Sequence, residues 1–265
     1  ARMEDKVSME VKEKRLQELN NLVNKYSLES NQKLVGKVVD VLVNGIPEDV
    51  KVIINAGVAN SAWSGGDYWK EAGVIEALTA FVHNGGGLLG VNDPSAVWAN
   101  GSFFQLAPVF GIDKDLGTKK CIGKYVNPVT EGTFAMEDTP NIGESMVENP
   151  GVYCKSANVS VLAANGKTPL ITLNQFGAGK AMYLSSFRVS KESTRFLMRA
   201  LLTLLGKEDK VRDYICDNLY TECAYYEEID KLVVINNSGD TQKTVIKTAK
   251  GDVTVELAPF ATKVL

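Results

Sequence analysis

Asn92 and Asp93 occupy the position in this chain that is most typical of an active site. They follow the apolar run Leu88–Val91, which predicts a short buried strand that enters a tight turn. In α/β sheets such a turn lies beyond the carboxyl end of a strand, where these folds usually place their sites. A nucleophilic enzyme would need a cysteine or serine there, supported by a histidine and a carboxylate. The turn holds neither, so the chemistry is expected to lie elsewhere.

The single histidine, His83, stands at the end of a predicted helix, where the helix dipole stabilises a cation. It therefore predicts a helix cap, because a catalytic base would need a partner nucleophile. Gly85–Gly87 precedes a strand, whereas a phosphate-binding loop follows a strand and opens a helix, so these glycines predict a helix stop. Gly177–Lys180 lacks the glycine spacing and the hydroxyl residue of a phosphate loop and predicts a hairpin turn.

Trp63, Asp67 and Trp69 belong to an aromatic loop, residues 62–69, expected at the same sheet edge as Asn92 and Asp93. Two indole rings and a carboxylate can stack on a sugar and bind its hydroxyl groups. A contact of these side chains with a neighbouring domain or subunit is the preferred interpretation, because protein interfaces are enriched in exposed Trp and Tyr. Both interpretations make these five residues the candidate binding residues, and no catalytic residue is assigned.

The four cysteines are Cys121, Cys154, Cys216 and Cys223. Cys216 and Cys223 are separated by six residues, which matches no zinc spacing, and one histidine cannot complete such a site. The spacings predict neither a metal site nor a redox pair, and no cofactor is expected. Buried reduced thiols are the expected state; a disulfide is the alternative, although it would be unusual in the cytosol.

The net charge of -3 and the pI of about 5.4 give no long-range attraction to nucleic acid or to an anionic membrane. The first thirty residues are highly charged and resemble no signal peptide, and no apolar run reaches membrane-spanning length. A soluble cytoplasmic protein is expected, with neither nucleic acid nor a membrane as partner.

Hydrophobic periodicity divides the chain into three parts. Residues 1–32 contain an amphipathic helix over 7–26 and a linker. Residues 33–217 alternate strands and helices, which predicts an α/β domain with a mostly parallel sheet flanked by helices. Its expected strands cover 38–43, 50–55, 88–91, 160–164, 170–173 and 181–185, and its expected helices cover 68–84, 103–110 and 191–205.

Residues 218–265 change to period-two alternation with turn signals, which predicts a small antiparallel all-β module. Consecutive strands are expected to pair; they cover 222–227, 231–236, 243–248, 253–257 and 262–265. A module of about fifty residues buries little apolar surface by itself, so it is expected to lean on the α/β domain.

Several runs resemble the C-terminal half of the 1,3-β-galactosyl-N-acetylhexosamine phosphorylases, also called lacto-N-biose phosphorylases. They are NGIPEDVKVIINAG at 44–57, AWSGG at 62–66, GVNDPSA at 90–96, STR at 193–195, and YY at 225–226 followed by KLVVINN at 231–237. The resemblance is colinear from about residue 44 to the end. Residues 1–32 carry no match to the family.

The resemblance implies cytoplasmic bacterial enzymes with a catalytic (β/α)8 barrel, an amidotransferase-like (flavodoxin-like) α/β domain and a small β domain. The α/β domain is similar to the trimer-forming domain of some β-galactosidases. The family cleaves a β-1,3-galactosyl link to an N-acetylhexosamine with inorganic phosphate and yields α-galactose 1-phosphate. A carboxylic acid of the barrel protonates the leaving oxygen, and phosphate replaces the water of an inverting hydrolase.

No segment long enough for a barrel precedes residue 44, since a barrel needs about 200 residues or more. The chain is therefore expected to be the accessory part of such a phosphorylase, inactive alone and reaching phosphate and disaccharide only through the barrel. A homo-oligomer is expected, with the aromatic loop and the N-terminal helix at or near the contact. The alternatives are a stand-alone carbohydrate-binding or regulatory module that uses the aromatic loop, and an amidotransferase-like hydrolase.

Overall fold

The computed structural model describes residues 14–15, 18, 46–57, 66–117, 120–211 and 213–265. The chain divides into two compact units, Ala1–Asn44 and Gly45–Leu265. The helix expected over 7–26 lies outside the described residues except for Lys14, Arg15 and Glu18, which are helical and exposed. The strand expected over 38–43 lies wholly outside them.

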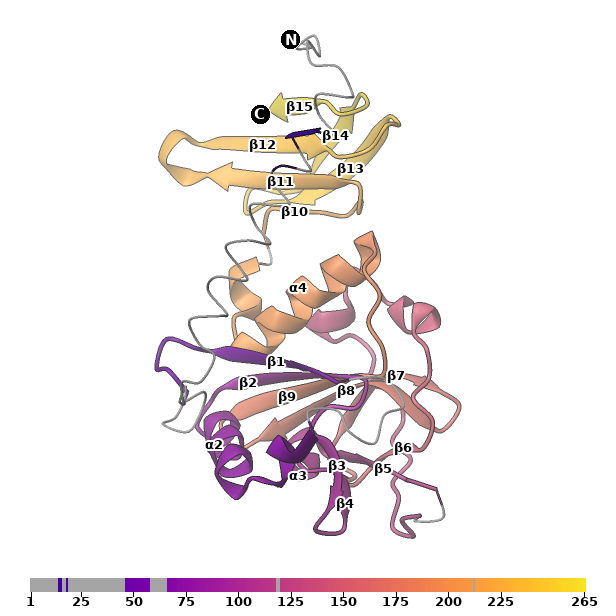
Figure 1. The fold of residues 1–265 in the computed structure, drawn as a ribbon. Coiled ribbons are helices and arrows are strands. Elements are labelled where there is room, and N and C mark those ends of the chain that lie inside the picture. The colour runs from indigo at the N-terminus through magenta and orange to yellow at the C-terminus, as the bar shows by residue number, and fades with distance from the viewer. Residues whose placement is uncertain (1–13, 16–17, 19–45, 58–65, 118–119, 212) are drawn as a thin grey trace. The chain divides into compact units, whose positions relative to one another are not determined.

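A five-stranded sheet forms the centre of the second unit (Figure 1). Its strands, in spatial order, are β1 (Val52–Ala56), β2 (Gly87–Val91), β9 (Gly179–Leu184), β8 (Thr168–Phe176) and β7 (Ser160–Asn165). β1, β2 and β9 pair in parallel, which confirms the parallel arrangement expected around the helix that joins β1 to β2.

The other half of this sheet is antiparallel, so the described sheet is mixed and not mostly parallel as expected. β7 pairs with β8 and β8 pairs with β9 in antiparallel fashion. The connection between β8 and β9 is only Gly177 and Ala178, and Gly177 has a φ of 59°. So short a loop can join only antiparallel neighbours, because a parallel crossover needs a dozen residues or more. The hairpin turn predicted at Gly177 is confirmed.

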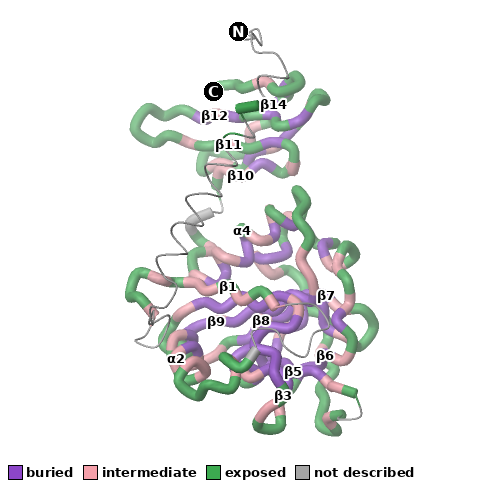
Figure 2. The backbone as a smooth tube through the Cα atoms, in the orientation of Figure 1, coloured by how far each residue is buried: buried purple, intermediate pink, exposed green. Residues whose placement is uncertain are grey.

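Two hydrophobic cores lie on the two faces of this sheet (Figure 1). Helix α2 (Ala72–His83) packs with Leu88 of β2 on one face, and helix α4 (Lys191–Leu205) packs with Leu89 on the other. Successive side chains of a strand point to opposite faces, which explains why neighbouring leucines enter different cores. All five residues of β2 are buried (Figure 2).

The bounds of α4 agree with the expected helix 191–205, and Ser190 and Ser193 cap it reciprocally. The helix expected over 68–84 is instead a 3-10 helix, η1 (Gly66–Lys70), followed by α2. The expected helix 103–110 is wrong in its first half, where β4 (Ser102–Phe104) precedes the one-turn helix α3 (Ala107–Phe110).

Long-range hydrogen bonds explain this difference. The buried carboxylate of Asp113 accepts bonds from the backbone N–H groups of Phe103 and Phe104 at 3.1 and 2.9 Å, which holds both residues in a strand. The remaining elements of the α/β domain are β3 (Ala96–Ala99), β5 (Ile112–Lys114), η2 (Phe134–Met136), η3 (Ile142–Ser145), β6 (Val152–Cys154) and η4 (Glu208–Val211).

The C-terminal module consists of two three-stranded antiparallel sheets around its own core. One sheet has the order β10 (Ile215–Cys216), β13 (Gln242–Lys247), β14 (Val253–Leu257); the other has the order β11 (Thr221–Tyr226), β12 (Lys231–Asn236), β15 (Thr262–Val264). The 3-10 helix η5 (Glu227–Ile229) joins β11 to β12. The expected pairing of all consecutive strands is wrong at two steps, because β15 pairs with β12, so β12 does not pair with β13 and β14 does not pair with β15. Within the described residues, no helix is both long and apolar enough to span a bilayer.

Candidate functional site

The predicted turn after β2 has the strained geometry typical of a functional turn. Asn92 has a φ of 61°, in the left-handed region that residues other than glycine rarely adopt. Its backbone N–H donates to the carbonyl of Leu184 at 2.9 Å, and its side-chain amide donates to the carbonyl of Gly57 at 3.1 Å. Asn92 therefore joins the carboxyl ends of β1, β2 and β9.

Gly57 lies directly against this turn. A Cβ atom at position 57 would overlap the backbone carbonyl of Asp93, so the approach of the two segments requires glycine there. The Gly57 N–H also donates to the Val91 carbonyl at 2.9 Å, in continuation of the pairing of β1 with β2. The turn is thus fixed by the ends of neighbouring strands.

Beneath the turn, Asp93 is fully buried and forms an ion pair with Lys114 of β5. The Lys114 ammonium donates to the two carboxylate oxygens at 2.9 and 3.0 Å and to the side-chain oxygen of Asn149 at 2.7 Å. The Asn149 amide donates in turn to Asp93 at 2.7 Å, to the Asn92 carbonyl at 2.8 Å and to the Tyr183 hydroxyl at 3.0 Å. These residues form the Asp93 network.

The Asp93 network neutralises its charges internally. Burial raises the pKa of Tyr183 well above its usual range and outweighs the opposite effect of the Asn149 hydrogen bond. A phenol held neutral and a carboxylate bound to an ammonium, both shielded from solvent, cannot exchange protons with a substrate. The arrangement can position the turn; it offers no nucleophile.

The aromatic loop is described only from residue 66 onward, so Trp63 lies outside the described residues. Asp67 is exposed on η1 and pairs with Lys70 at 2.6 Å. Trp69 is half-buried and packs against the core on the α2 side of the sheet, while Tyr68 is 76% exposed. Asp67 is exposed, whereas Asp93 is buried and bound within its network. Their role in binding sugar or a domain stays a prediction.

His83 ends α2, as the cap interpretation requires. Its carbonyl accepts a hydrogen bond from the Ala178 N–H at 2.8 Å, and its exposed ring stands edge-on to Phe176 at 6.0 Å between centroids. Gly85 has a φ of 110° and terminates the helix, which confirms the helix stop. In the part of the chain that the structure describes, no group of three or more His, Cys, Asp or Glu side chains is arranged to hold a metal ion.

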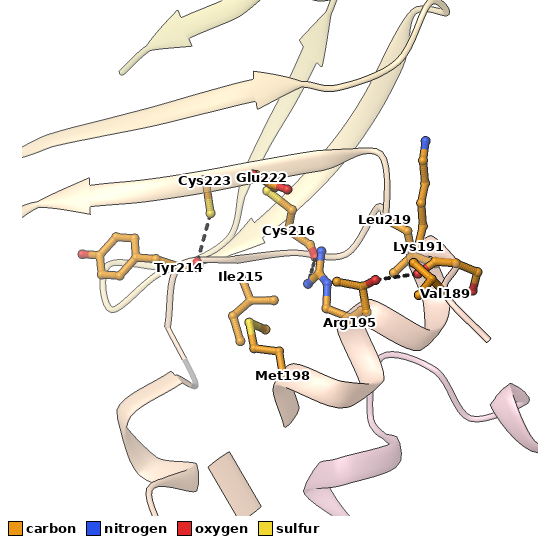
Figure 3. Close-up of a pocket in the computed structure, with 12 residues that line it drawn as sticks. Val189, Lys191, Arg195, Met198, Tyr214, Ile215, Cys216, Leu219, Glu222 and Cys223 are labelled. Atoms are coloured by element: carbon orange, nitrogen blue, oxygen red, sulfur yellow. Dashed lines mark hydrogen bonds between the residues drawn. The ribbon is translucent and has the colours of Figure 1, made fainter. Parts of the chain in front are cut away.

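Sequence reasoning did not find a pocket of about 730 Å³ lined by α4, β10 and β11 and by the segments next to them (Figure 3). Its wall is largely apolar, with Met198, Ile215 and Leu219 among its lining residues. The polar groups on it include Lys191, Arg195 and Glu222. A mostly apolar concavity with a few polar groups is typical of a small-molecule or segment-binding site.

Arg195 connects α4 to β10 at this pocket, because its guanidinium donates to the carbonyl of Cys216 at 3.1 Å (Figure 3). The same guanidinium contacts the Asp138 carboxylate at 3.5 Å. Lys191 lies over the ring of Tyr220 at 3.4 Å. One turn further along α4, the buried Arg199 binds Asp138 through two nitrogens at 2.5 and 2.8 Å. The run STR at 193–195 was the signal in the sequence, since it places Arg195 on the first turns of α4.

Two thiol groups share this wall. Cys216 of β10 is 2% exposed, Cys223 of β11 is half-buried, and their side chains hydrogen-bond to each other. All four cysteines are free, and only Cys154 and Cys216 are buried, so the expectation of buried reduced thiols is confirmed for those two alone. Cys216 and Cys223 come from β10 and β11, two strands of different sheets that follow each other after a short loop.

Comparisons with known proteins match two parts of this chain. Residues 37–209 match the model of the lacto-N-biose phosphorylase central domain, and residues 214–265 match that of the lacto-N-biose phosphorylase C-terminal domain. A β-galactosidase from Rahnella sp. R3 is a structural neighbour with a TM-score of 0.41 and 17% identity over 81% of this chain and 32% of that one. That TM-score is too low to assign a shared fold.

Among curated relatives, the D-galactosyl-β-1→4-L-rhamnose phosphorylase of Lachnoclostridium phytofermentans is 36% identical over 83% of this chain and 30% of its own length. The 1,3-β-galactosyl-N-acetylhexosamine phosphorylase of Bifidobacterium longum subsp. longum is 31% identical over 80% of this chain and 32% of its own length. A stretch of 45 residues is also 53% identical to 9% of a tRNA-2-methylthio-N(6)-dimethylallyladenosine synthase of Bacillus mycoides, which is too little to assign a family. The chain thus spans about a third of the length of the phosphorylases that it matches. The two domain matches together cover most of the sequence, and the chain belongs to the lacto-N-biose phosphorylase family.

Proposed function

We propose that this chain forms the accessory central and C-terminal domains of a galactoside phosphorylase, and that catalysis takes place on the (β/α)8 barrel of that enzyme. The enzyme would cleave β-1,3-galactosyl-N-acetylhexosamine with phosphate and release α-galactose 1-phosphate in the cytoplasm. The central domain would be amidotransferase-like (flavodoxin-like). The general acid and the phosphate site would belong to the barrel.

One observation carries this proposal: the strained turn at the carboxyl end of β2 is built around an ion pair and presents no reactive group. Asp93 is 0% exposed and bound by Lys114 and Asn149, and Asn92 uses its amide to hold Gly57. An inverting phosphorylase needs a carboxylic acid that reaches the leaving oxygen, and a carboxylate in this environment cannot do so. The turn serves as a positioning element for the fold.

The test is a phosphorolysis assay with the purified 265-residue chain, lacto-N-biose and inorganic phosphate. We expect no galactose 1-phosphate above a blank without protein, while the Bifidobacterium relative, as positive control, releases it under the same conditions. Release by this chain that is abolished in an Asp93→Asn variant would refute the proposal and place the chemistry at the turn.

A carbohydrate-binding module is the second candidate function. It is favoured by the exposure of Asp67 and Tyr68 side by side on η1, because an exposed phenol and a carboxylate can together hold a sugar. Isothermal titration with galactose, N-acetylglucosamine and galactose 1-phosphate distinguishes the two. Heat of binding that Tyr68→Ala removes and Phe260→Ala leaves intact would favour the module, since Phe260 is exposed to a similar degree in the C-terminal domain.

A further inference from the structure

The pair of thiols on the wall of the pocket beside α4 is not used by the proposed function. Cys216 lies on β10 and Cys223 on β11, and the loop between the two strands is short. Both residues line the pocket (Figure 3), and a hydrogen bond between their side chains shifts the pKa of each thiol. A small oxidant that enters the pocket therefore meets both thiols on one wall.

We propose that Cys216 and Cys223 form a redox-modification site, in which a hydroperoxide oxidises the two thiols to a reversible disulfide that links β10 to β11. This assigns to the C-terminal domain a response to oxidants that is independent of phosphorolysis. Two cysteines in contact, one acting as the attacking group and the other as the resolving group, are the arrangement typical of redox-sensitive sites.

The surroundings of Cys216 and Cys223 determine which thiol is the nucleophile and which is the resolving thiol. The hydrogen bond from the Cys223 thiol lowers the pKa of Cys216, and hydrogen bonds from Thr221 and Thr244 act in the same direction, while burial opposes them. The charge of Arg195 on α4 also favours the Cys216 thiolate. The pKa of Cys223 is raised, first by the same hydrogen bond and then by burial, so Cys223 keeps its proton. Cys216 is the nucleophile and Cys223 the resolving thiol.

Charged and titratable groups from each neighbouring element surround the pair. α4 contributes Arg195 and Lys191, β11 contributes Glu222, and the segment before β10 contributes Tyr214, all of them on the pocket wall. The Cys223 sulfur lies 3.0 Å from the Tyr214 carbonyl. Because a thiol has one proton, Cys223 donates either to that carbonyl or to Cys216, and ionisation of Cys216 favours the second partner.

The oxidation balances with hydrogen peroxide as the oxidant. The Cys216 thiolate attacks one peroxide oxygen, the O–O bond breaks, and the leaving hydroxide takes up a proton to become water; Cys216 is then a sulfenic acid. The Cys223 sulfur next attacks the Cys216 sulfur, the S–O bond breaks, and the hydroxide leaves as water with the Cys223 proton. Two electrons, one from each sulfur, have reduced one peroxide to two waters. A dithiol reductant reverses the step by exchange.

The sequence makes the test direct, because trypsin releases both cysteines in one peptide. Cleavage after Arg212 and Lys231 gives residues 213–231, which contain Cys216 and Cys223 and no other Lys or Arg before Lys231. The folded chain is treated with graded hydrogen peroxide, blocked with iodoacetamide, digested without reduction and analysed by mass spectrometry. Cys121 and Cys154, on other peptides, serve as internal controls.

We expect peptide 213–231 to lose two hydrogen atoms and to escape alkylation at peroxide concentrations at least about tenfold below those that change Cys154. Dithiothreitol should restore both alkylation sites. In Cys223→Ser, with folding checked by circular dichroism, the sulfenic acid on Cys216 should persist and react with dimedone; Cys121→Ser should behave as the parent. Full alkylation of both cysteines after treatment, direct conversion of Cys216 to a sulfinic acid, or a disulfide that forms only after denaturation would each overturn the proposal.

Discussion

Lys114 and Asp93 form an ion pair in the interior, where a charge that loses its partner is costly. Lys114 is 7% exposed and binds both Asp93 oxygens and Asn149. Replacing it with an apolar residue removes the ammonium that neutralises the buried Asp93 carboxylate. We expect Lys114→Met to lower the free energy of unfolding by about 3 to 5 kcal/mol, measured by urea denaturation.

The matched control is Lys70→Met, which removes the exposed ion pair with Asp67. Solvent screens such a pair, so this change should cost less than about 1 kcal/mol. If both variants unfold at the same urea concentration, the buried Asp93–Lys114 pair contributes no more to stability than the exposed Asp67–Lys70 pair.

Cys154 and Cys216 are almost equally inaccessible to solvent, but their thiols should differ in reactivity. Burial raises the pKa of Cys154 to about 11, whereas hydrogen bonding lowers that of Cys216. A lowered pKa means that the thiolate is present at lower pH. The alkylation rate of Cys216 by iodoacetamide should therefore reach half its maximum below the usual thiol pKa of about 8.5, and that of Cys154 only above it. Identical pH profiles for the two residues would contradict the assignment of Cys216 as the nucleophile.

For single residues, the sequence predicts well where a residue lies in the fold, but it predicts poorly which other residues it contacts. Asn92 and Asp93 stand on a turn after a buried strand, as the apolar run before them predicts. The partners of Asp93 come from 21 and 56 residues further along the chain, on segments whose path depends on the whole domain. The same holds for Cys216 and Cys223, whose spacing matches no motif and whose strands β10 and β11 belong to two different sheets.

Among the elements, the hairpin of β8 and β9 lies close against the end of α2. A Cβ atom on Gly179 would overlap the backbone carbonyls of Val82 and Gly86, which cannot rotate away as a side chain could. We expect Gly179→Ala to destabilise the protein by about 1 to 3 kcal/mol in thermal or urea unfolding.

Gly73 is the matched control, because a Cβ atom there would meet nothing within 4 Å. It lies in the first turn of α2, where alanine restricts the unfolded chain and favours the helix. Gly73→Ala should stabilise by about 0.5 to 1 kcal/mol. Equal signs for the two substitutions would show that the contact of α2 with the hairpin is looser than the structure indicates.

Elements with strong local signals could be predicted, and those held by distant contacts could not. α4 combines an apolar face with a capping serine at its start, and β12 and β14 alternate cleanly; all three have the expected bounds. β4 reads as helical by periodicity, yet Asp113 holds it as a strand through side-chain hydrogen bonds. Phe103 and Phe104 are buried, and two adjacent apolar residues are compatible with a buried helix as well as with a buried strand, so the pattern alone could not decide.

At the scale of the whole molecule, we propose that the chain self-associates through the aromatic loop. Tyr68 exposes three quarters of its surface next to Asp67, and exposed aromatic side chains are enriched in protein interfaces. Equilibrium sedimentation at micromolar concentration should show a homodimer or a larger oligomer.

Tyr68→Ala should weaken that assembly at least about tenfold, because aromatic side chains dominate interface energetics. Phe260→Ala should leave it unchanged, since Phe260 belongs to the C-terminal domain. Tyr68 is preferred to Trp69 for this purpose because Trp69 packs against the core and its loss would also destabilise the fold. A monomer at this concentration contradicts self-association, and an oligomer indifferent to Tyr68→Ala contradicts the location of its interface.

The order of the elements follows the signals in the sequence, because strands and helices alternate in one part of the chain and a series of strands follows in the other. The strand directions could be predicted only where a connection fixes them. The helix between β1 and β2 makes them parallel, and the loop Gly177–Ala178 makes β8 and β9 antiparallel. The pairing of β2 with β9 depends on no local signal.

That pairing sets the order in which the sheet can assemble. β7, β8 and β9 are joined by tight turns and can form a meander quickly. β2, in contrast, ends at Val91 and can pair only after β9, which begins at Gly179, has been brought to it. Closing so long a loop is slow, so the β2–β9 ladder should be the last part of the sheet to gain protection in pulsed hydrogen exchange. During synthesis on the ribosome, the apolar strand β2 emerges well before the strand that covers its edge. This interval is when the nascent chain is most exposed to aggregation and most dependent on chaperones.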